Sequence, residues 1–181
     1  MRCSGSSSPP RPLNPDDAAV VASQLGRVPR GSWRVAARCI AGAPLVIAVA
    51  PVLEDASPFP TTFWLTCPRL VERVGELESA GEGARYAARA ERDMDFAAAL
   101  LGADAAYRGA RLAEGDGDDP CSGVGTAGQR DPLMVKCIHS RLAAHLAGVP
   151  DPIGAEVASV VTSGLCEATR DARCWPRVTA D

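Results

Sequence analysis

The chain has 181 residues, of which 46% are hydrophobic and 4% aromatic, and its formal net charge is −3 at pH 7. This length is typical of one domain, and the hydrophobic fraction argues against global disorder. The negative net charge argues against non-specific nucleic-acid binding, which needs a basic surface. We therefore expect a folded protein with no nucleic-acid partner.

The cellular compartment is predicted from the apolar runs and the cysteines. The start of the chain lacks the apolar stretch of a secretion signal. The longest apolar run, over residues 43–53, is too short to span a bilayer and contains Pro44 and Pro51. There are 7 cysteines, an odd number that does not suggest a disulfide framework. We expect a cytoplasmic protein with reduced thiols and no membrane insertion.

The first half of the chain predicts one helix and a small sheet. Residues 1–15 are rich in Ser and Pro and are predicted to form a disordered tail. Asp16 and Asp17 open a helical pattern that ends at Gly26. Alternating or continuous apolar residues with turn residues between them predict strands. Three strands are expected, over residues 33–40, 45–53 and 61–66.

The second half predicts mainly helices. Thr66 is the expected N-cap of the first of them, with Cys67 or Pro68 as its first residue. Residues 115–131 form a flexible loop rich in Gly and Asp, and residues 166–181 form a loose tail. Helices are expected over residues 67–79, 84–101, 103–113, 133–147 and 153–165.

This order of elements predicts the fold class and the domain organisation. A helix, three short strands and then several helices indicate an α+β fold. We expect a small, mainly antiparallel three-stranded sheet packed by about five or six helices. Residues 16–165 would form this single domain.

Three cysteines have distinctive surroundings. Cys39 ends a predicted strand, and Cys67 lies at a predicted helix N-terminus. Cys137 lies near another helix start, between the only lysine, Lys136, and His139. A helix N-terminus or a neighbouring cation lowers the pKa of a thiol. Three thiolates with His139 match a Cys₃His zinc site, whereas a single thiolate with His139 as base matches a nucleophile.

Spacing alone does not favour either function. Zinc ligands usually come in close pairs, and only Cys137 and His139 are paired here. Cysteine often serves as a small buried hydrophobic residue, so inert core thiols are the alternative interpretation. The remaining cysteines fall in predicted tails or in the loop, and His145 is expected at the surface. These remaining cysteines are Cys3, Cys121, Cys166 and Cys174.

Basic residues suggest an anion site. Arg34 and Arg38 share one face of a predicted strand, Arg69 follows Cys67, and Lys136 precedes Cys137. Guanidinium groups suit phosphate and carboxylate, so these four residues are candidates for binding an anionic small molecule. The alternative is a solvated basic face in an arginine-rich chain.

Two further patterns carry no function. Residues 123–128 fit G-x-G-x-x-G, but no strand precedes them, so a dinucleotide site is not expected. The acidic residues just before them lack the spacing of a calcium loop and are expected to be solvated. These acidic residues are Asp116, Asp118 and Asp119.

Several of these motifs together resemble a known family. The strongest block is Pro-Phe-Pro-Thr-Thr-Phe-Trp-Leu-Thr-Cys-Pro-Arg-Leu at residues 58–70. Over about residues 20–157 the chain resembles a bacterial family called domain of unknown function 501, which is common in actinobacteria. The other matching stretches are residues 24–31, 35–39 with Gly42 and Pro44, 77–79, 135–139 and 151–154.

The resemblance implies a shared site and a biological context. The family motifs centre on Cys39, Cys67, Cys137 and His139, which would hold zinc or, less favourably, an iron–sulfur cluster. Gene neighbourhoods in the family imply a link to cell division and a partner there. Ala41 replaces a second cysteine found in many members, so this site would lack one ligand.

Three functions are therefore weighed. The leading hypothesis is a metal-binding protein with zinc on the Cys₃His cluster. The second is a cysteine-dependent enzyme, or a binding protein, for a phosphorylated or anionic small molecule. The third is an interaction module without metal, in which the helices within residues 84–113 bind another protein.

Overall fold

The computed structural model describes residues 15–163 and Cys174, so most of both predicted tails lies outside the described residues. It contains a three-stranded antiparallel sheet and six α-helices in this part, which confirms the predicted α+β fold. The strands are β1 (Trp33–Arg38), β2 (Pro44–Val49) and β3 (Phe63–Leu65). The helices are α1 (Pro15–Leu25), α2 (Pro68–Ser79), α3 (Glu82–Ala90), α4 (Met94–Glu114), α5 (Ile138–Leu146) and α6 (Pro152–Val161), with a 3₁₀ turn η1 (Thr126–Gly128).

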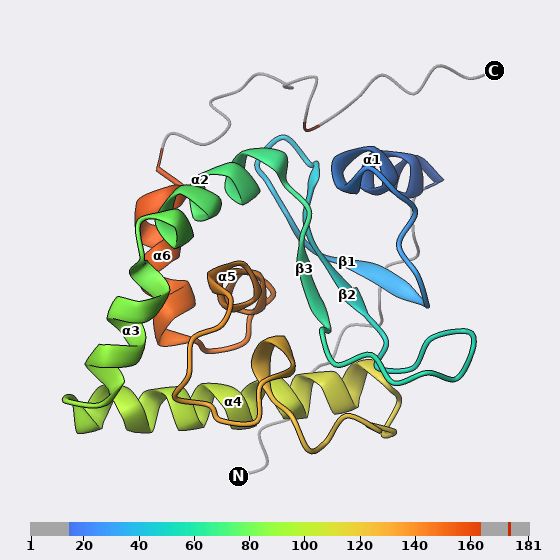
Figure 1. Ribbon diagram of the computed structural model, residues 1–181. Coiled ribbons are helices and arrows are strands. Elements are labelled where there is room, and N and C mark those ends of the chain that lie inside the picture. Colours follow the sequence, from blue (N-terminus) through green and yellow to red (C-terminus); the bar gives the residue numbers. More distant parts are fainter. Residues whose placement is uncertain (1–14, 164–173, 175–181) are drawn as a thin grey trace, which may run out of the picture.

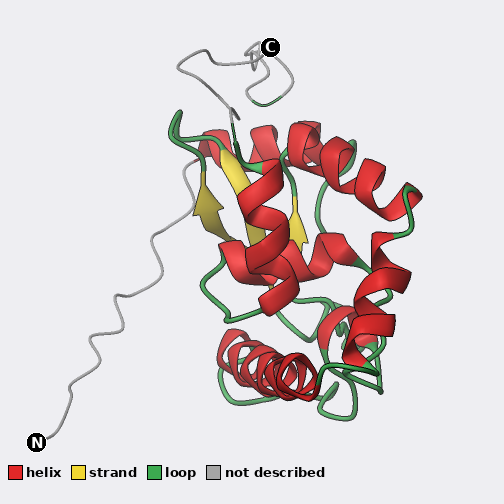
Figure 2. Ribbon diagram, turned by 90° about the vertical axis from the view of Figure 1, so that its left-hand side faces the viewer, coloured by secondary structure: helices red, strands yellow, loops and turns green. Residues whose placement is uncertain are grey.

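The sheet has β2 in the middle and buries both of its faces. Successive residues of a strand point to opposite faces. Val46 and Ala48 of β2 pack into the main core with the helices α2 to α6. Ile47 and Val49 pack against Val21 of α1 on the other face. The sheet therefore separates α1 from α5, as Figure 1 shows, and Figure 2 shows α4 nearly end-on beneath it.

The helix boundaries differ from the prediction between residues 84 and 113. The sequence predicts a break near Gly102, but α4 runs through this residue. The break lies before Met94, where the side chain of Asp93 accepts a hydrogen bond of 3.0 Å from the Phe96 amide. An N-cap of this kind satisfies an amide that the first turn leaves unpaired. Gly102 is exposed and lies within the helix without close contacts.

The start of α5 also differs from the prediction. The sequence predicts a helix from Leu133, but α5 begins only at Ile138 because Cys137 is extended, with φ −149° and ψ 114°. The preceding segment is held by Arg141 of α5, which is 1% exposed. Arg141 Nη2 donates to the carbonyl of Pro132 at 3.1 Å. The segment that leads to Cys137 is thus tied to α5 through Arg141.

A buried ion pair joins α5 to α6. Arg141 Nη1 lies 3.1 Å from Asp151 Oδ2, and both side chains are 2% exposed. The other carboxylate oxygen of Asp151 accepts a hydrogen bond of 2.7 Å from the Gly154 amide and caps α6. A Cβ on Gly154 would lie 2.5 Å from the Arg141 carbonyl oxygen, so the two helices pack closely here.

A second buried arginine holds the Gly- and Asp-rich loop. Arg111 of α4 is 0% exposed, and its Nε lies 3.0 Å from both carboxylate oxygens of Asp119. The prediction that the acidic cluster is solvated is therefore wrong for Asp119. A Cβ on Gly125 would lie 1.5 Å from Asp104 Oδ1, so packing requires a glycine there. Gly125 thus allows this loop to pack closely against α4.

Replacing Asp151 tests the ion pair that supports α5. Asp151→Ala removes a helix cap and leaves Arg141 buried without its carboxylate, so we expect a loss of about 3–5 kcal/mol of unfolding free energy. Urea unfolding followed by circular dichroism measures it. Asp93→Ala removes an exposed cap and should cost only about 1 kcal/mol. Equal losses in the two variants would contradict the role assigned to the Arg141–Asp151 pair.

Candidate functional site at the start of α5

The end of α2 and the start of α5 meet at one carboxylate. Glu78, in the last turn of α2, accepts a hydrogen bond of 2.6 Å from the Ile138 amide on its Oε1. The same oxygen lies 3.4 Å from the His139 amide. These amides belong to the first turn of α5, where backbone donors lack helical partners and negative charge is favoured. Glu78 therefore anchors the start of α5.

The ring of His139 is held between two helices. Its Nδ1 lies 3.1 Å from Glu78 Oε1, and its Nε2 lies 3.0 Å from the backbone carbonyl oxygen of Val71 in α2. A carbonyl only accepts, so Nε2 carries a proton in this geometry. The neutral ring would then present the lone pair of Nδ1 towards Glu78.

The thiol of Cys137 lies beside this ring. The hydroxyl of Ser140 donates to Cys137 Sγ at 3.5 Å. Burial raises the pKa of Cys137, but hydrogen bonding to His139 and Ser140 outweighs it, so the pKa is lowered overall. The hydrogen bond to Cys137 is also the largest cause that raises the pKa of His139, to about 9. The two side chains thus favour a thiolate paired with an imidazolium.

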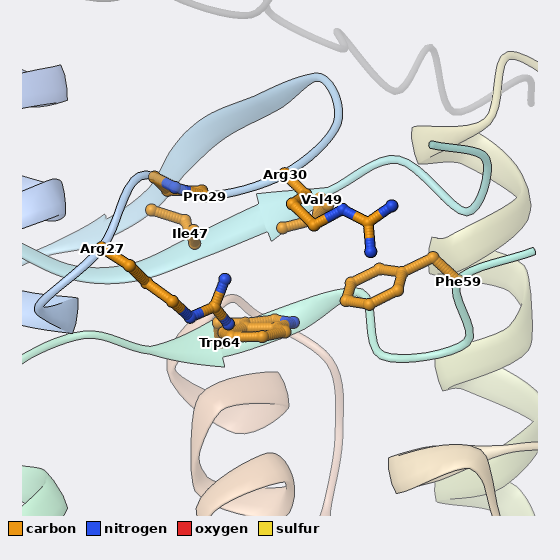
Figure 3. Close-up of a pocket in the computed structure, with 7 residues that line it drawn as sticks. All are labelled: Arg27, Pro29, Arg30, Ile47, Val49, Phe59 and Trp64. Atoms are coloured by element: carbon orange, nitrogen blue, oxygen red, sulfur yellow. The ribbon is translucent and has the colours of Figure 1, made fainter. Parts of the chain in front are cut away.

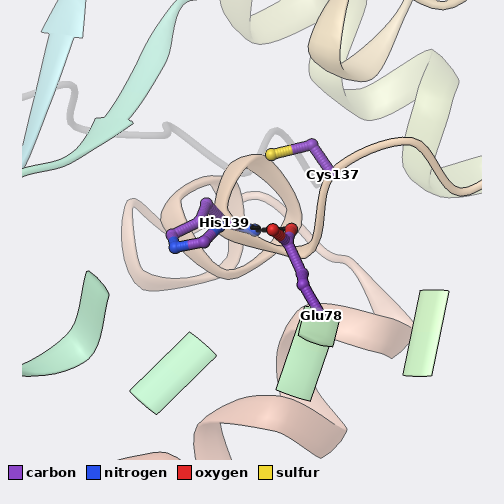
Figure 4. Close-up of side chains that lie close together, drawn as sticks. All are labelled: Glu78, Cys137 and His139. Carbon is purple, nitrogen blue, oxygen red and sulfur yellow. Dashed lines mark hydrogen bonds and ion pairs between the residues drawn. The ribbon is translucent and has the colours of Figure 1, made fainter. Parts of the chain in front are cut away.

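Three potential metal ligands converge here. One ligand atom each of Glu78, Cys137 and His139 lies within 4.8 Å of the others. Figure 4 shows the three side chains close together. Glu78 comes from α2, whereas Cys137 and His139 come from the start of α5. The group is partly exposed: the side chain of His139 is 25% exposed and that of Glu78 is 33% exposed.

A cavity adjoins the site. It has a volume of about 240 Å³, and His139 and Ser140 form one of its walls. The other wall comes from β3, including Phe63 and Trp64, and from Thr61 shortly before it. A small molecule in this cavity would contact the ring of His139.

Two of the predicted metal ligands lie outside the group. Cys39 is half-buried in the turn after β1, where its amide donates to the Ala43 carbonyl at 2.9 Å. Cys67 is 1% exposed and packs in the main core. It occupies the N-cap position of α2, so the prediction of Thr66 as the cap is wrong. Cys137 and His139 are the two predicted ligands that come together.

The predicted anion-binding arginines of β1 are engaged in ion pairs. Arg34 forms a hydrogen-bonded ion pair with Glu114 at the end of α4. Arg38 pairs with Asp17 of α1 at 2.6 Å, and this pairing is the main cause that raises the pKa of Arg38. Neither lines the cavity beside His139. These two guanidiniums connect β1 to α4 and α1.

The other two predicted anion ligands flank the cysteines. Lys136 is exposed directly before Cys137, and its amide donates to Gln129 Oε1 at 3.2 Å. Arg69 is half-buried in the first turn of α2. An anion site made of Arg34, Arg38, Arg69 and Lys136 stays a prediction.

The helix surface considered for protein binding carries an apolar stripe. Met94, Leu101 and Leu112 of α4 are 87%, 52% and 44% exposed. Their spacings of seven and eleven residues correspond to about two and three helical turns, so they share one side of the helix. This stripe fits the interaction-module alternative. No described helix is long and apolar enough to span a membrane.

Glu78 is the site residue that sequence reasoning missed. It lies sixty-one residues before His139, so no local spacing connects the two. The one signal was the short stretch at residues 77–79, which belongs to the family-like motifs. A glutamate in a family motif at a predicted helix end could have been added to the ligand candidates.

Comparison with known proteins identifies the family. Residues 35–159, well over half of the chain, match the family described as "Protein of unknown function (DUF501)". The chain therefore belongs to this family, which confirms the resemblance seen in its motifs. No curated protein and no solved structure gave a significant match. All three residues of the Glu78–Cys137–His139 group lie within the matched range.

The titration of His139 tests the contact with Cys137. In metal-free protein we expect the ring to titrate with a pKa of about 9 in an NMR experiment. Because the pKa of the ring is raised in the folded protein, its protonation stabilises the fold fully at pH values below the ordinary pKa of histidine. This contribution is lost as the pH rises through about 9. Cys137→Ala should lower the pKa, whereas Cys39→Ala should leave it unchanged. An ordinary histidine pKa in the wild type would contradict the contact.

Proposed function

We propose that this protein binds a metal ion, zinc foremost, through Glu78, Cys137 and His139. The observation that carries the proposal is the convergence of the three ligand atoms within 4.8 Å of one another. Cell division as the biological setting stays a prediction from the family resemblance. An iron–sulfur cluster is less favoured, because such clusters are held mainly by several thiolates and this group has one.

The donor set suits zinc. Thiolate, imidazole and carboxylate are the three side-chain types that bind it in proteins. Ligands at zinc–ligand distances of 2.0–2.3 Å in a tetrahedron lie roughly 3.3–3.8 Å apart. The His139 Nδ1 and Glu78 Oε1 atoms, 3.1 Å apart, are already that close. A small shortening of the longest distance between two of the three ligand atoms would complete the arrangement that zinc requires.

The orientation of His139 supports the same conclusion. A metal-bound histidine usually donates its other ring N–H to a carbonyl or a carboxylate, which fixes the ring. Here Nε2 and the Val71 carbonyl oxygen, 3.0 Å apart, supply that contact. Nδ1 is then the nitrogen available to a metal ion, and it is the one that faces Glu78.

Three protein ligands leave a fourth position for another group. In zinc proteins, closed structural sites use four protein ligands, and sites that act on a substrate commonly use three. The cavity of about 240 Å³ beside His139 would give a small molecule access to that position. The proposed centre is therefore of the open kind.

Metal content in ligand variants tests the centre. Protein purified under reducing conditions, loaded with zinc and freed of excess should hold about one zinc per chain by elemental analysis. Cys137→Ser, His139→Gln and Glu78→Gln each remove a ligand. Zinc affinity should therefore fall by more than the 10–100-fold that is typical when a hydrogen-bond partner of a ligand is removed. Zinc-free wild-type protein, or full retention in Cys137→Ser, would overturn the proposal.

Two further variants separate this centre from the four-residue cluster expected from the motifs. Cys39 lies in the turn after β1, outside the three-residue group, so Cys39→Ser should keep its zinc. Cys67→Ala probes the buried thiol at the start of α2 in the same way. Loss of zinc in both variants would favour the cluster of Cys39, Cys67, Cys137 and His139.

The contact between Cys137 and His139 favours a second candidate function, a cysteine-dependent enzyme. A thiolate beside an imidazole is the arrangement of an activated nucleophile. Ser140 supports the thiol from the same turn, and the ring of His139 borders a cavity that could hold a substrate. In this function a phosphorylated or other anionic molecule is the predicted substrate.

Alkylation rates test the nucleophile. In metal-free protein at neutral pH, iodoacetamide labelling mapped by mass spectrometry should modify Cys137 faster than Cys39, although both are half-buried. His139→Gln should slow the labelling of Cys137 and leave the labelling rates of the other cysteines unchanged. Burial raises the pKa of Cys121, so this thiol should react slowly in every variant. Equal rates for Cys137 and Cys39 would contradict an activated thiolate, and protection of Cys137 by zinc would favour the metal centre.

A further inference from the structure

A second cavity lies on the face of the sheet that carries α1. Its volume is about 230 Å³, and its walls are aromatic and aliphatic with two arginines at the side, as Figure 3 shows. The residues that matter are Ile47 and Val49 of β2, Trp64 of β3, Phe59 of the loop before β3, and Arg27 and Arg30 of the segment after α1.

The aromatic wall is fixed in place. Phe59 and Trp64 stack with ring centroids 5.7 Å apart and an angle of 27° between their planes. The indole Nε1 of Trp64 donates to the Thr61 carbonyl at 2.8 Å, which holds the ring. Ile47 and Val49 close the bottom of the cavity. A planar apolar group entering it would therefore meet a preformed surface.

The arginines make this cavity positive. The guanidinium carbon of Arg27 lies 4.9 Å from the centroid of the Trp64 ring, and no carboxylate pairs with Arg27 in the part of the chain described here. Arg30 pairs with Asp55 at 2.9 Å, but both side chains are 59% exposed. Exposed pairs of this kind are weak, so an incoming anion can compete with Asp55.

We propose that this cavity binds a small planar aromatic molecule that carries one anionic group, a carboxylate or a phosphate. The ring would pack against Phe59 and Trp64, and the anionic group would accept hydrogen bonds from Arg27 and Arg30. The cavity is smaller than the roughly 300–1,000 Å³ of drug-sized sites, which favours a single ring over a dinucleotide.

Other ligand classes fit less well. An aliphatic anion makes no ring contact with Phe59 and Trp64, a neutral aromatic molecule leaves the guanidiniums unused, and a cation is repelled by them. None of the lining residues belongs to the Glu78–Cys137–His139 group. The proposal is therefore independent of the proposed metal centre, and either can fail alone.

Calorimetric titration of the full chain tests the ligand class. Phenyl phosphate and benzoate are the probes, and their difference shows which anionic group is preferred. Cyclohexyl phosphate lacks the aromatic ring, inorganic phosphate lacks any ring, and benzyl alcohol lacks the charge. We expect saturable binding of at least one probe, at least about tenfold tighter than each of these comparators. No saturable binding, or comparators that bind equally well, would overturn the proposal.

Variants test the position of the site. Arg27 is exposed, so Arg27→Gln should fold normally and weaken the preferred probe about tenfold or more by removing a charged hydrogen-bond donor. Arg85→Gln removes a similar exposed arginine, 75% exposed in α3, and should bind like the wild type. Equal affinities in the two variants would show that the ligand binds elsewhere and would overturn this assignment.

Discussion

Arg141 is buried between two helices, and its two Nη groups find acceptors inside the protein, Nη1 at Asp151 and Nη2 at the Pro132 carbonyl. The first contact holds α5 against α6, and the second holds the segment that leads to Cys137. Because Cys137 is extended, α5 starts at Ile138, and its first amides face Glu78. The position of the thiol and the imidazole thus depends on how α5 packs against α2 and α6.

The charges at the start of α5 explain why one site supports two candidate chemistries. Glu78 and a Cys137 thiolate both carry negative charge, and both lie close to His139. A proton on the imidazole balances them in metal-free protein, which is why the pKa of His139 rises to about 9, chiefly through Cys137. A metal ion would supply that positive charge in place of the proton. Binding of metal and availability of the thiolate are then mutually exclusive states of the same three side chains.

Local sequence patterns predicted the structural features that depend on residues close together along the chain. Alternation and turn residues located the hairpin of β1 and β2, and the pairing of Cys137 with His139 was visible from their spacing. The contact of Glu78 with His139 was not visible from spacing, because it arises only through the packing of α2 on α5. The arginines of the first strand show the same limit: alternation placed Arg34 and Arg38 on one face, but the packing of α4 and α1 gives each a carboxylate. Arg27 and Arg30, which precede the strand, line the cavity instead.

Trp64 lines two cavities, the one beside His139 and the one beside Arg27. Its ring is stacked on Phe59 and contacted by Arg27, and its indole N–H is bonded to the Thr61 carbonyl, so the ring has little freedom to move. Coupling between two binding sites needs an element that can adopt two conformations. A rigid residue shared by both cavities therefore transmits little effect of ligand binding from one cavity to the other. Ligand binding in one cavity should therefore be nearly independent of the other, and Cys137→Ser should leave the affinity for the aromatic anion unchanged.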